Sequence, residues 1–177
     1  MTFSKGTAAV VQVKLVRSKA DADVVLVLAY EFIDWLRERY PEWDAAIDTY
    51  LEHQKFDEQI KDVLIHYAPP RGECLLATRD GTPVGIVMLK DLGGGVCEMN
   101  RMFVRENARG LGVGRALVHH LTDRAIEMGF RTMNLSTGPR HHEAIALYRS
   151  AGFQLDDRPS DPGNPDNVVL MKIDLAK

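Results

Sequence analysis

Three glycines at every second position follow an arginine in the stretch RENARGLGVGRAL, residues 105–117. A β-rich segment precedes this stretch, and a helix-like apolar pattern follows it. The first backbone N–H groups of a helix lack partners within the helix, and the helix dipole adds partial positive charge there. Glycines let the main chain approach a ligand, and Arg109 can add a charged, two-pronged donor. The stretch therefore predicts a site for phosphate or pyrophosphate.

Two other phosphate-binding patterns do not fit this stretch. A P-loop requires lysine and then serine or threonine after its last glycine, whereas Arg115 and Ala116 follow Gly114. A dinucleotide-binding fingerprint requires a third glycine three residues after the second, in an early strand–helix–strand unit, and both features are missing. A glycine-rich turn without a ligand stays open as an alternative, although three glycines cost backbone entropy on folding.

The pattern of the remaining sequence predicts the elements that position this turn. Helical spacing predicts helices over residues 18–39, 45–66, 113–128 and 140–151. Alternation and β-branched residues predict strands over residues 10–16, 96–104, 130–137, 153–155 and 167–175, and a hairpin that turns at Asp80-Gly81. Hairpins combined with crossovers indicate one mixed sheet with helices on its faces, a fold of the α+β (mixed α/β) class.

The composition is that of one soluble globular domain. The chain has 177 residues, and its net charge of −3 argues against general nucleic-acid binding, which needs a basic excess. Cys74 and Cys97 have no metal-ligand spacing, the six histidines have none either, and a stray cysteine pair favours a reducing compartment. The first residues lack the apolar core and cleavage site of a signal peptide, and no stretch approaches the length of a membrane span. We therefore expect a cytoplasmic protein without a metal, a nucleic-acid partner or a membrane partner.

A second motif, together with the glycine turn, points to one protein family. The segment Arg109 to Gly114 (RGLGVG) resembles the R-x-x-G-x-G/A motif of the GNAT (Gcn5-related) N-acetyltransferase superfamily, and LYRSAGF, residues 147–153, resembles the second signature of that superfamily. The segment EMNRMFV lies just upstream of the turn, as in the superfamily. The resemblance covers nearly the whole chain. It implies a single GNAT domain over residues 1–177, with a central mixed, mostly antiparallel sheet of about seven strands flanked by helices.

Within that domain, the resemblance implies an acetyl-CoA-binding core over residues 96–155 and a helical acceptor-side region over residues 18–66. Acetyl-CoA would be the co-substrate, with its pyrophosphate on the glycine turn and its pantetheine arm paired with the preceding strand like an added strand. His141 stands where many members have an asparagine that contacts the cofactor, and the alternative for this histidine is a solvated helix start. Asn134 reaches either the cofactor or only the sheet edge, and Arg115 is either a phosphate ligand or an exposed helix residue. The implied cofactor-binding residues are Met102, Phe103, Val104, Arg109, Gly110, Leu111, Gly112, Val113, Gly114, Arg115, Asn134 and His141.

The resemblance also implies two catalytic residues. Acetyl transfer from a thioester to an amine leaves a thiolate, and Tyr148 lies where the tyrosine of the family motif returns a proton to that sulfur. Glu98 lies six residues before Val104, as the catalytic glutamate of histone-type members does on the equivalent strand, and would remove the amine proton directly or through water. The alternatives are a tyrosine that only packs in the core and a glutamate paired with Arg101 or another strand charge. A bulge in this strand would change the face that Glu98 shows.

The predicted function is transfer of an acetyl group from acetyl-CoA to a primary amine, by direct attack in a ternary complex. A small-molecule acceptor is favoured, a protein amine stays open, and so does the choice between a monomer and a homodimer. Trp35, Tyr40 and Trp43 are expected to form one wall of the acceptor site. An acidic loop on the other side would suit a cationic amine, although a solvated loop is the alternative; its aspartates are Asp156, Asp157, Asp161 and Asp166. The competing function is a GNAT-fold module that senses acyl-CoA without turnover.

Overall fold

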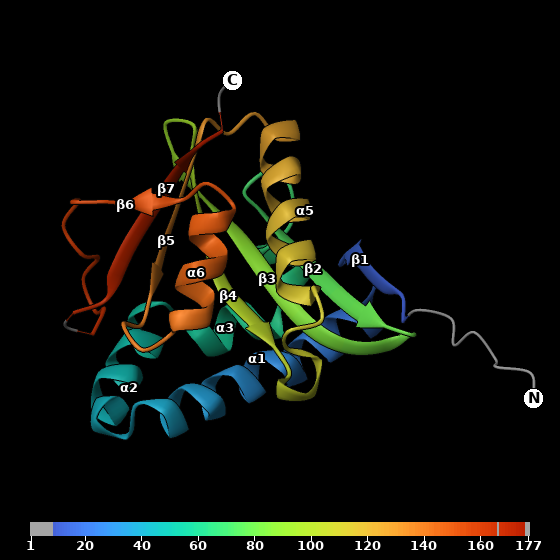
Figure 1. The fold of residues 1–177 in the computed structure, drawn as a ribbon, viewed down its shortest axis with the longest axis horizontal. Coiled ribbons are helices and arrows are strands. Elements are labelled where there is room, and N and C mark those ends of the chain that lie inside the picture. The colour runs from blue at the N-terminus through green and yellow to red at the C-terminus, as the bar shows by residue number, and fades with distance from the viewer. Residues whose placement is uncertain (1–8, 166, 176–177) are drawn as a thin grey trace, which may run out of the picture.

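The computed structural model describes residues 9–165 and 167–175. Residues 1–8, which belong to the stretch considered as a signal peptide, and Asp166 of the acidic loop lie outside the described residues. Within the described residues, seven strands form one sheet in the order β1-β2-β3-β4-β5-β7-β6 (Figure 1). The strands are β1 (Val11–Leu15), β2 (Gly72–Arg79), β3 (Thr82–Gly93), β4 (Val96–Val104), β5 (Thr132–Thr137), β6 (Gln154–Leu155) and β7 (Val169–Asp174).

The sheet is mixed and mostly antiparallel, which confirms the predicted fold class. Neighbouring strands are antiparallel except β4 and β5, which are parallel. The β2–β3 hairpin turns at Asp80 and Gly81 as predicted, and their φ angles of 50° and 80° have the sign that this tight turn requires. β4 and β5 pair only over Val96–Glu98 and Thr132–Asn134. Beyond these residues the two strands are not paired, which leaves one edge of β4 open inside the sheet.

Helices cover both faces of the sheet (Figure 1). The helices α5 and α6 pack on one face, and α1 to α4 pack on the other. The helices are α1 (Lys19–Arg39), α2 (Asp44–His53), α3 (Phe56–Lys61), α4 (Val63–His66), α5 (Val113–Glu127) and α6 (His142–Ser150), with 3-10 turns η1 (Pro41–Trp43) and η2 (Glu106–Ala108). Among the described helices, none is long and apolar enough to cross a membrane.

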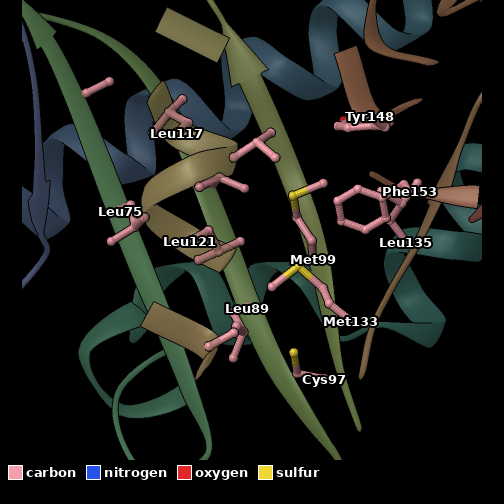
Figure 2. Close-up of a cluster of buried hydrophobic side chains, with 14 of the residues drawn as sticks. Leu75, Leu89, Cys97, Met99, Leu117, Leu121, Met133, Leu135, Tyr148 and Phe153 are labelled. Carbon is pink, nitrogen blue, oxygen red and sulfur yellow. The ribbon is translucent and has the colours of Figure 1, made fainter. Parts of the chain in front are cut away.

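A hydrophobic core lies on each side of the sheet. On one side, the apolar stripe of α5, which includes Leu117 and Leu121, packs on strand residues such as Met99 (Figure 2). Tyr148 of α6 and Phe153 extend this core, and their ring centroids lie 5.9 Å apart. On the other side, α1 to α4 bury a second cluster of apolar side chains against β2, β3 and β4. The strands that carry the site are therefore held from both faces.

The prediction of one helix over residues 45–66 is wrong, because this segment forms the three short helices α2, α3 and α4. The chain breaks before α3 at Lys55, whose φ of 50° lies in the left-handed region. The break turns Phe56 and Ile60 into the core beneath α1. There the Phe56 ring meets Tyr30 of α1 edge to face, with 5.6 Å between centroids. Apolar spacing does not reveal such breaks, because each short piece keeps the helical period.

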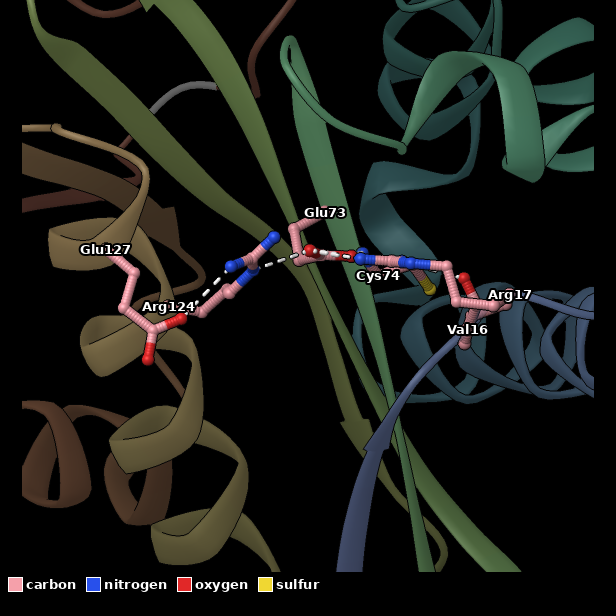
Figure 3. Close-up of polar contacts among 6 residues, drawn as sticks. All are labelled: Val16, Arg17, Glu73, Cys74, Arg124 and Glu127. Carbon is pink, nitrogen blue, oxygen red and sulfur yellow. Dashed lines mark hydrogen bonds and ion pairs between the residues drawn. The ribbon is translucent and has the colours of Figure 1, made fainter.

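A buried carboxylate links separate segments of the fold. Glu73 of β2 is fully buried and accepts hydrogen bonds from Arg17, at 2.6 and 2.7 Å, and from Arg124 of α5, at 2.9 Å (Figure 3). Burial would raise the pKa of this carboxyl, but the two guanidinium groups outweigh burial and the pKa is lowered. Arg124 also pairs with the exposed Glu127 at 3.0 Å. The cluster ties the β1–α1 junction and α5 to β2.

Candidate active site

A cavity of about 830 Å³ opens where β4 and β5 separate. Its walls come from the unpaired parts of both strands, the first turn of α5, α6, and the helices α1 and α2. Cavities of this size hold cofactors and small ligands. The predicted site residues in its lining are Met102, Phe103, Val104, Arg109, Gly110, Gly112, Gly114, Arg115, His141 and Tyr148. The structure thus brings most of the predicted residues to one cavity.

The glycine turn leads into α5 at this cavity. Gly110 and Gly112 have φ angles of 73° and 85°, which residues with a Cβ rarely adopt. The N–H of Ala116 bonds to the carbonyl of Gly112, so the N–H groups of the residues between them have no partner within the helix. Among the described residues, no side chain caps this end of α5. The first turn of α5 is therefore open to an anion.

Gly114 has a packing role. A Cβ at this position would lie 3.1 Å from Cε of Met102 on β4 and 3.1 Å from Cδ2 of Leu147 on α6. The absence of a side chain lets the start of α5 approach both elements closely. Because Leu147 belongs to the second sequence signature, the two signatures meet in space at Gly114.

Arg109 lies against the cavity wall that α1 contributes. Its Nε donates a 2.9 Å hydrogen bond to the carbonyl of Val104 at the end of β4. Its Cζ lies 4.8 Å from the ring centroid of Trp35 and 6.0 Å from that of Phe103. Such cation–π contacts contribute about 0.5 to 2 kcal/mol each. Together they hold the guanidinium beside the glycine turn.

A bulge in β4 sets which side chains face each side of the sheet. Phe103 pairs with Ile86 of β3 whereas Asn100 pairs with Met88, so β4 carries an extra residue between these pairs. Arg101 lies in the bulge with a φ of 49°, which is rare for a residue other than glycine. Before the bulge the odd-numbered residues face the α5 core, and after it the even-numbered residues do.

Glu98 precedes the bulge and lies on the face of β4 turned away from the α5 core. Its Oε1 accepts a 3.3 Å hydrogen bond from Nδ2 of Asn100, and no ion pair joins it to Arg101. The alternative of a Glu98–Arg101 pair is therefore wrong. Burial raises the pKa of the half-buried Glu98 carboxyl, and the Asn100 hydrogen bond opposes that rise. Glu98 is not part of the cavity lining, and its role as a base stays a prediction.

Tyr148 faces the cavity from α6 and is only 5% exposed. Its ring packs beside Phe153, but its hydroxyl makes no hydrogen bond to another described residue. Burial raises the pKa of this phenol above its ordinary value, so the group keeps its proton at neutral pH. The residue combines core packing with an unused proton donor at the cavity.

His141 is buried at the start of α6, so the alternative of a solvated helix start is wrong. Its Nδ1 lies 3.0 Å from Oγ1 of Thr137, and its ring stacks on Trp35 with 4.8 Å between centroids. Burial lowers the pKa of the imidazole to about 4, so the ring is neutral at physiological pH. Its Nε2 is buried and has no hydrogen-bond partner in the described part of the chain. A neutral imidazole therefore forms part of the cavity wall.

Three predicted cofactor-binding residues do not line the cavity. Leu111 is exposed in the turn, and Val113 is buried in the core beneath α5. Asn134 is half-buried in the paired part of β5, opposite Glu98 and Lys172. Roles for their backbone or side chains stay predictions.

Two of the three aromatic residues predicted for the acceptor wall line the cavity, and their contact with an acceptor stays a prediction. Trp35 and Trp43 line the cavity. Tyr40 is fully buried behind them, stacks on Trp43 at 4.3 Å between centroids, and accepts a 2.9 Å hydrogen bond from the N–H of Arg140. Its prediction as a wall residue is wrong. Tyr40 instead supports the β5–α6 connection, where a Cβ on Gly138 would overlap its hydroxyl.

The acidic loop does not turn its described aspartates to the cavity. Asp156 pairs with Arg158 and, at 3.2 Å, with Lys172. The loop contributes Asn164 and Pro165 to the cavity lining instead. The charge pattern of the loop therefore gives no support to a cationic acceptor.

Sequence reasoning missed two arginines of the cavity, Arg39 of α1 and Arg101 of β4. Arg39 donates from Nη2 to the carbonyl of Arg140 at 2.7 Å, which joins α1 to the β5–α6 connection. A signal for Arg101 was present, because a charged residue stands in the middle of the segment EMNRMFV where apolar alternation changes its phase.

Comparison with known sequences indicates the same family as the site does. The site features concerned are the geometry of the turn, the open edge of β4 and the motif on α6. A profile described as the Acetyltransferase (GNAT) family matches residues 29–153. The chain belongs to the GNAT family. An uncharacterised N-acetyltransferase of Schizosaccharomyces pombe is 34% identical to this GNAT protein over 129 residues, which are 72% of this chain and 78% of the yeast chain. An IAA acetyltransferase of Azospirillum brasilense is 34% identical over 159 residues, which are 89% of this chain and 94% of the bacterial chain.

Solved structures show the same fold as this GNAT protein. The paia N-acetyltransferase of Thermoplasma acidophilum, determined in complex with coenzyme A, aligns with a TM-score of 0.72 at 15% identity. The alignment covers 93% of this chain and 99% of the archaeal chain. The predicted GNAT fold is therefore confirmed.

Proposed function

We propose that this GNAT protein transfers an acetyl group from acetyl-CoA to a primary amine of a small molecule, by direct attack in a ternary complex. One observation carries the proposal: the open first turn of α5, the arginines beside it and the buried Tyr148 line the same cavity. The N-acetyltransferase and acetyltransferase names of the two 34%-identical relatives support the same chemistry.

The residues of the cavity fit acetyl-CoA as the donor. The free N–H groups of α5, with Arg109 and Arg115, suit a pyrophosphate. The open edge of β4 beside Met102 suits the amides of a pantetheine arm, which would add to the sheet like a strand. Residues 96–155 would form the donor-binding core, and the helices within residues 18–66 the acceptor side. The coenzyme A complex of the Thermoplasma acidophilum structure supports binding of an acyl-CoA by this fold.

In the proposed reaction, the amine nitrogen attacks the carbonyl carbon of the thioester. The new C–N bond replaces the C–S bond, whose electron pair stays on sulfur. Tyr148 donates its proton to that sulfur, and Glu98 takes the proton released by the amine, through a water because its side chain does not line the cavity. The products are the acetylated amine and the free thiol of coenzyme A. Holding both substrates in line supplies a large part of the acceleration.

The test is a turnover assay with a panel of amines. The purified protein is mixed with acetyl-CoA and with amino acids, polyamines, arylalkylamines, aminoglycosides or a peptide with a free amino terminus. Thiol release and the mass of the acetylated product are both measured. We expect thiol release that depends on one class of amine and saturates with both substrates. Acetyl-CoA binding without amine-dependent thiol release would contradict the enzyme and favour an acyl-CoA sensor.

A further inference from the structure

Arg101 brings a buried positive charge to the cavity. The residue is 6% exposed and lines the cavity from the β4 bulge. Its Nη1 donates to the hydroxyl of Tyr67 and lies 3.4 Å from Oδ1 of Asn100. Its Nη2 is buried, and no residue that the structure describes forms a hydrogen bond with it. Its Cζ lies 5.2 Å from the ring centroids of Phe56 and Tyr67. Among the described residues, no carboxylate forms an ion pair with it.

A buried arginine without a carboxylate partner is unusual. A guanidinium loses its hydration when it is buried, and proteins ordinarily compensate with a paired anion. The aromatic faces and neutral oxygens around Arg101 compensate only in part, because they carry no net negative charge. A carboxylate has two oxygens whose spacing matches the guanidinium fork. The missing partner of Arg101 is therefore a carboxylate or a similar anion.

The other charges of the cavity do not fill this need. Arg109 and Arg115 lie at the glycine turn, where the proposed donor brings its own phosphates. Arg39 of α1, a further cation of the lining, donates to the carbonyl of Arg140. Glu143 is the carboxylate that the described lining contains, and it lies in the first turn of α6, not on β4 or α2. The unpaired charge at Arg101 therefore remains for the second substrate.

The surroundings of Arg101 are apolar and aromatic on the acceptor side. Tyr50 of α2 lines the same cavity, together with Trp43 and Ile47. Burial raises the pKa of the Tyr50 hydroxyl to about 12; the charges of Glu98 and Asp161 act in the same direction, and the charge of Arg101 opposes them. A ligand beside Arg101 would meet its guanidinium and an apolar wall.

Building on the function proposed above, we propose that the amine acceptor also carries a carboxylate, which binds Arg101, and an apolar body, which lies against Tyr50 and Trp43. The acceptor class is then an apolar or aromatic amino acid or a related amino carboxylate. This class differs from the cationic amine that the acidic loop suggested. Arg101 would be a specificity-determining residue that selects the acceptor without touching the donor.

Matched pairs of acceptors test this inference. Phenylalanine and phenethylamine, and tryptophan and tryptamine, differ within each pair only by the carboxylate. For at least one pair, we expect the wild-type kcat/KM to be about tenfold or more higher for the amino acid, as one charged hydrogen-bonded contact predicts. Arg101→Gln should bring the two members of that pair within about threefold. Arg101→Lys, which keeps the charge but loses the fork, should give an intermediate preference.

A binding measurement decides the question without turnover. The probes are 3-phenylpropionate and 3-phenylpropanol, added to the protein in the presence of coenzyme A. We expect the carboxylate, and not the alcohol, to raise the midpoint of thermal unfolding of the wild type and of the control Arg71→Gln, an exposed arginine outside the cavity. Arg101→Gln should lose this shift while its response to coenzyme A persists.

The outcomes separate this inference from the proposed function. A wild type that acetylates the decarboxylated amines as well as the amino acids, or that binds the alcohol as well as the carboxylate, would overturn the role of Arg101 and leave acetyl transfer intact. A protein that does not bind acetyl-CoA in the same buffer would instead overturn the proposed function. If Arg101→Gln does not fold, the wild-type comparisons and Arg101→Lys still decide the question.

Discussion

The guanidinium of Arg109 lies over the ring of Trp35, with 4.8 Å between Cζ and the ring centroid. This contact joins the glycine turn to α1, which is far from the turn in sequence and contributes one wall of the cavity. The same tryptophan stacks on His141 at the start of α6. Trp35 therefore stands between the groups proposed to hold the donor and the helices proposed to hold the acceptor.

Replacing Trp35 by leucine should weaken acetyl-CoA binding although the ring is not expected to contact the pyrophosphate. Loss of the cation–π contact leaves Arg109 less ordered, and a contact of this kind is worth about fivefold in affinity. Isothermal titration measures the change. The control is Trp43→Leu, because Trp43 also lines the cavity but stacks on Tyr40 and not on Arg109. Equal loss in both variants would argue against the role of the Trp35–Arg109 contact.

Replacing Gly112 by aspartate should abolish acetyl-CoA binding. The new carboxylate would repel a pyrophosphate at the first turn of α5, where anions are otherwise stabilised. Gly129→Asp at the other end of α5 is a matched control, because both glycines have a positive φ, 85° and 88°, and open space around an added Cβ. Circular dichroism would confirm that both variants fold. Retained affinity in Gly112→Asp would place the pyrophosphate elsewhere.

Replacing Tyr148 by phenylalanine should lower kcat by about 100-fold, as loss of a positioned general acid does. The affinity for acetyl-CoA should change little, because the ring stays in the core beside Phe153. Steady-state thiol release and calorimetry give the two values. Tyr30→Phe removes the hydroxyl of an exposed tyrosine on α1 and should leave kcat unchanged. An unaltered kcat in Tyr148→Phe would remove this residue as the acid.

The pH profile tests Glu98. Burial raises the pKa of the Glu98 carboxyl above the ordinary value of about 4.3. As the pH falls, Glu98 therefore loses the carboxylate form that a base needs at a higher pH than an exposed glutamate does. We expect kcat/KM to fall as pH drops through that raised pKa. Glu98→Gln should lower the rate by about 100-fold and remove this acid limb, whereas Glu58→Gln on the exposed side of α3 should keep it. An acid limb that survives in Glu98→Gln belongs to another group.

The buried cluster at Glu73 makes a prediction on stability. Glu73→Gln should lower the free energy of unfolding by about 2 to 3 kcal/mol, because charge-assisted hydrogen bonds are lost while both arginines can still turn toward water. Urea unfolding measures the change, and Glu127→Gln, the exposed partner of Arg124, should cost less than about 0.5 kcal/mol. Equal effects in the two variants would contradict the role of burial.

The same cluster fixes the sign of a pH effect. The folded-state pKa of Glu73 is lowered, so its contribution to stability is complete above the unfolded value of about 4.3 and is lost as pH falls through the folded value. The difference in stability between wild type and Glu73→Gln should therefore shrink in acid. If this stability difference instead grew as the pH fell below about 4.3, the folded-state pKa of Glu73 would not be lowered.

The glycine turn could be predicted because its causes are local. The positive φ angles at Gly110 and Gly112 and the free N–H groups of α5 follow from neighbouring residues. The α+β sheet could be predicted because most strands and helices keep one clear period along the sequence. The second motif, which begins at Leu147, then indicated the family, and the structure packs Leu147 beside Gly114 of the turn.

The remaining features depend on contacts between distant segments, which periodicity does not encode. The break at Lys55 accompanies the burial of Phe56 in the core beneath α1. The burial of Arg101 depends on a bulge in β4 and on Tyr67, which comes from the segment after α4. The inward position of Tyr40, predicted as a wall residue, depends on its bond to Arg140.

The most direct test of the central claim is a calorimetric titration of the wild type with acetyl-CoA, dephospho-CoA and S-acetylpantetheine. The account predicts binding of acetyl-CoA, binding of dephospho-CoA within about tenfold because it keeps the pyrophosphate, and an affinity at least about 100-fold weaker for S-acetylpantetheine, which lacks it. Equal binding of acetyl-CoA and S-acetylpantetheine, or no binding of either, would contradict a pyrophosphate site at the Arg109 turn.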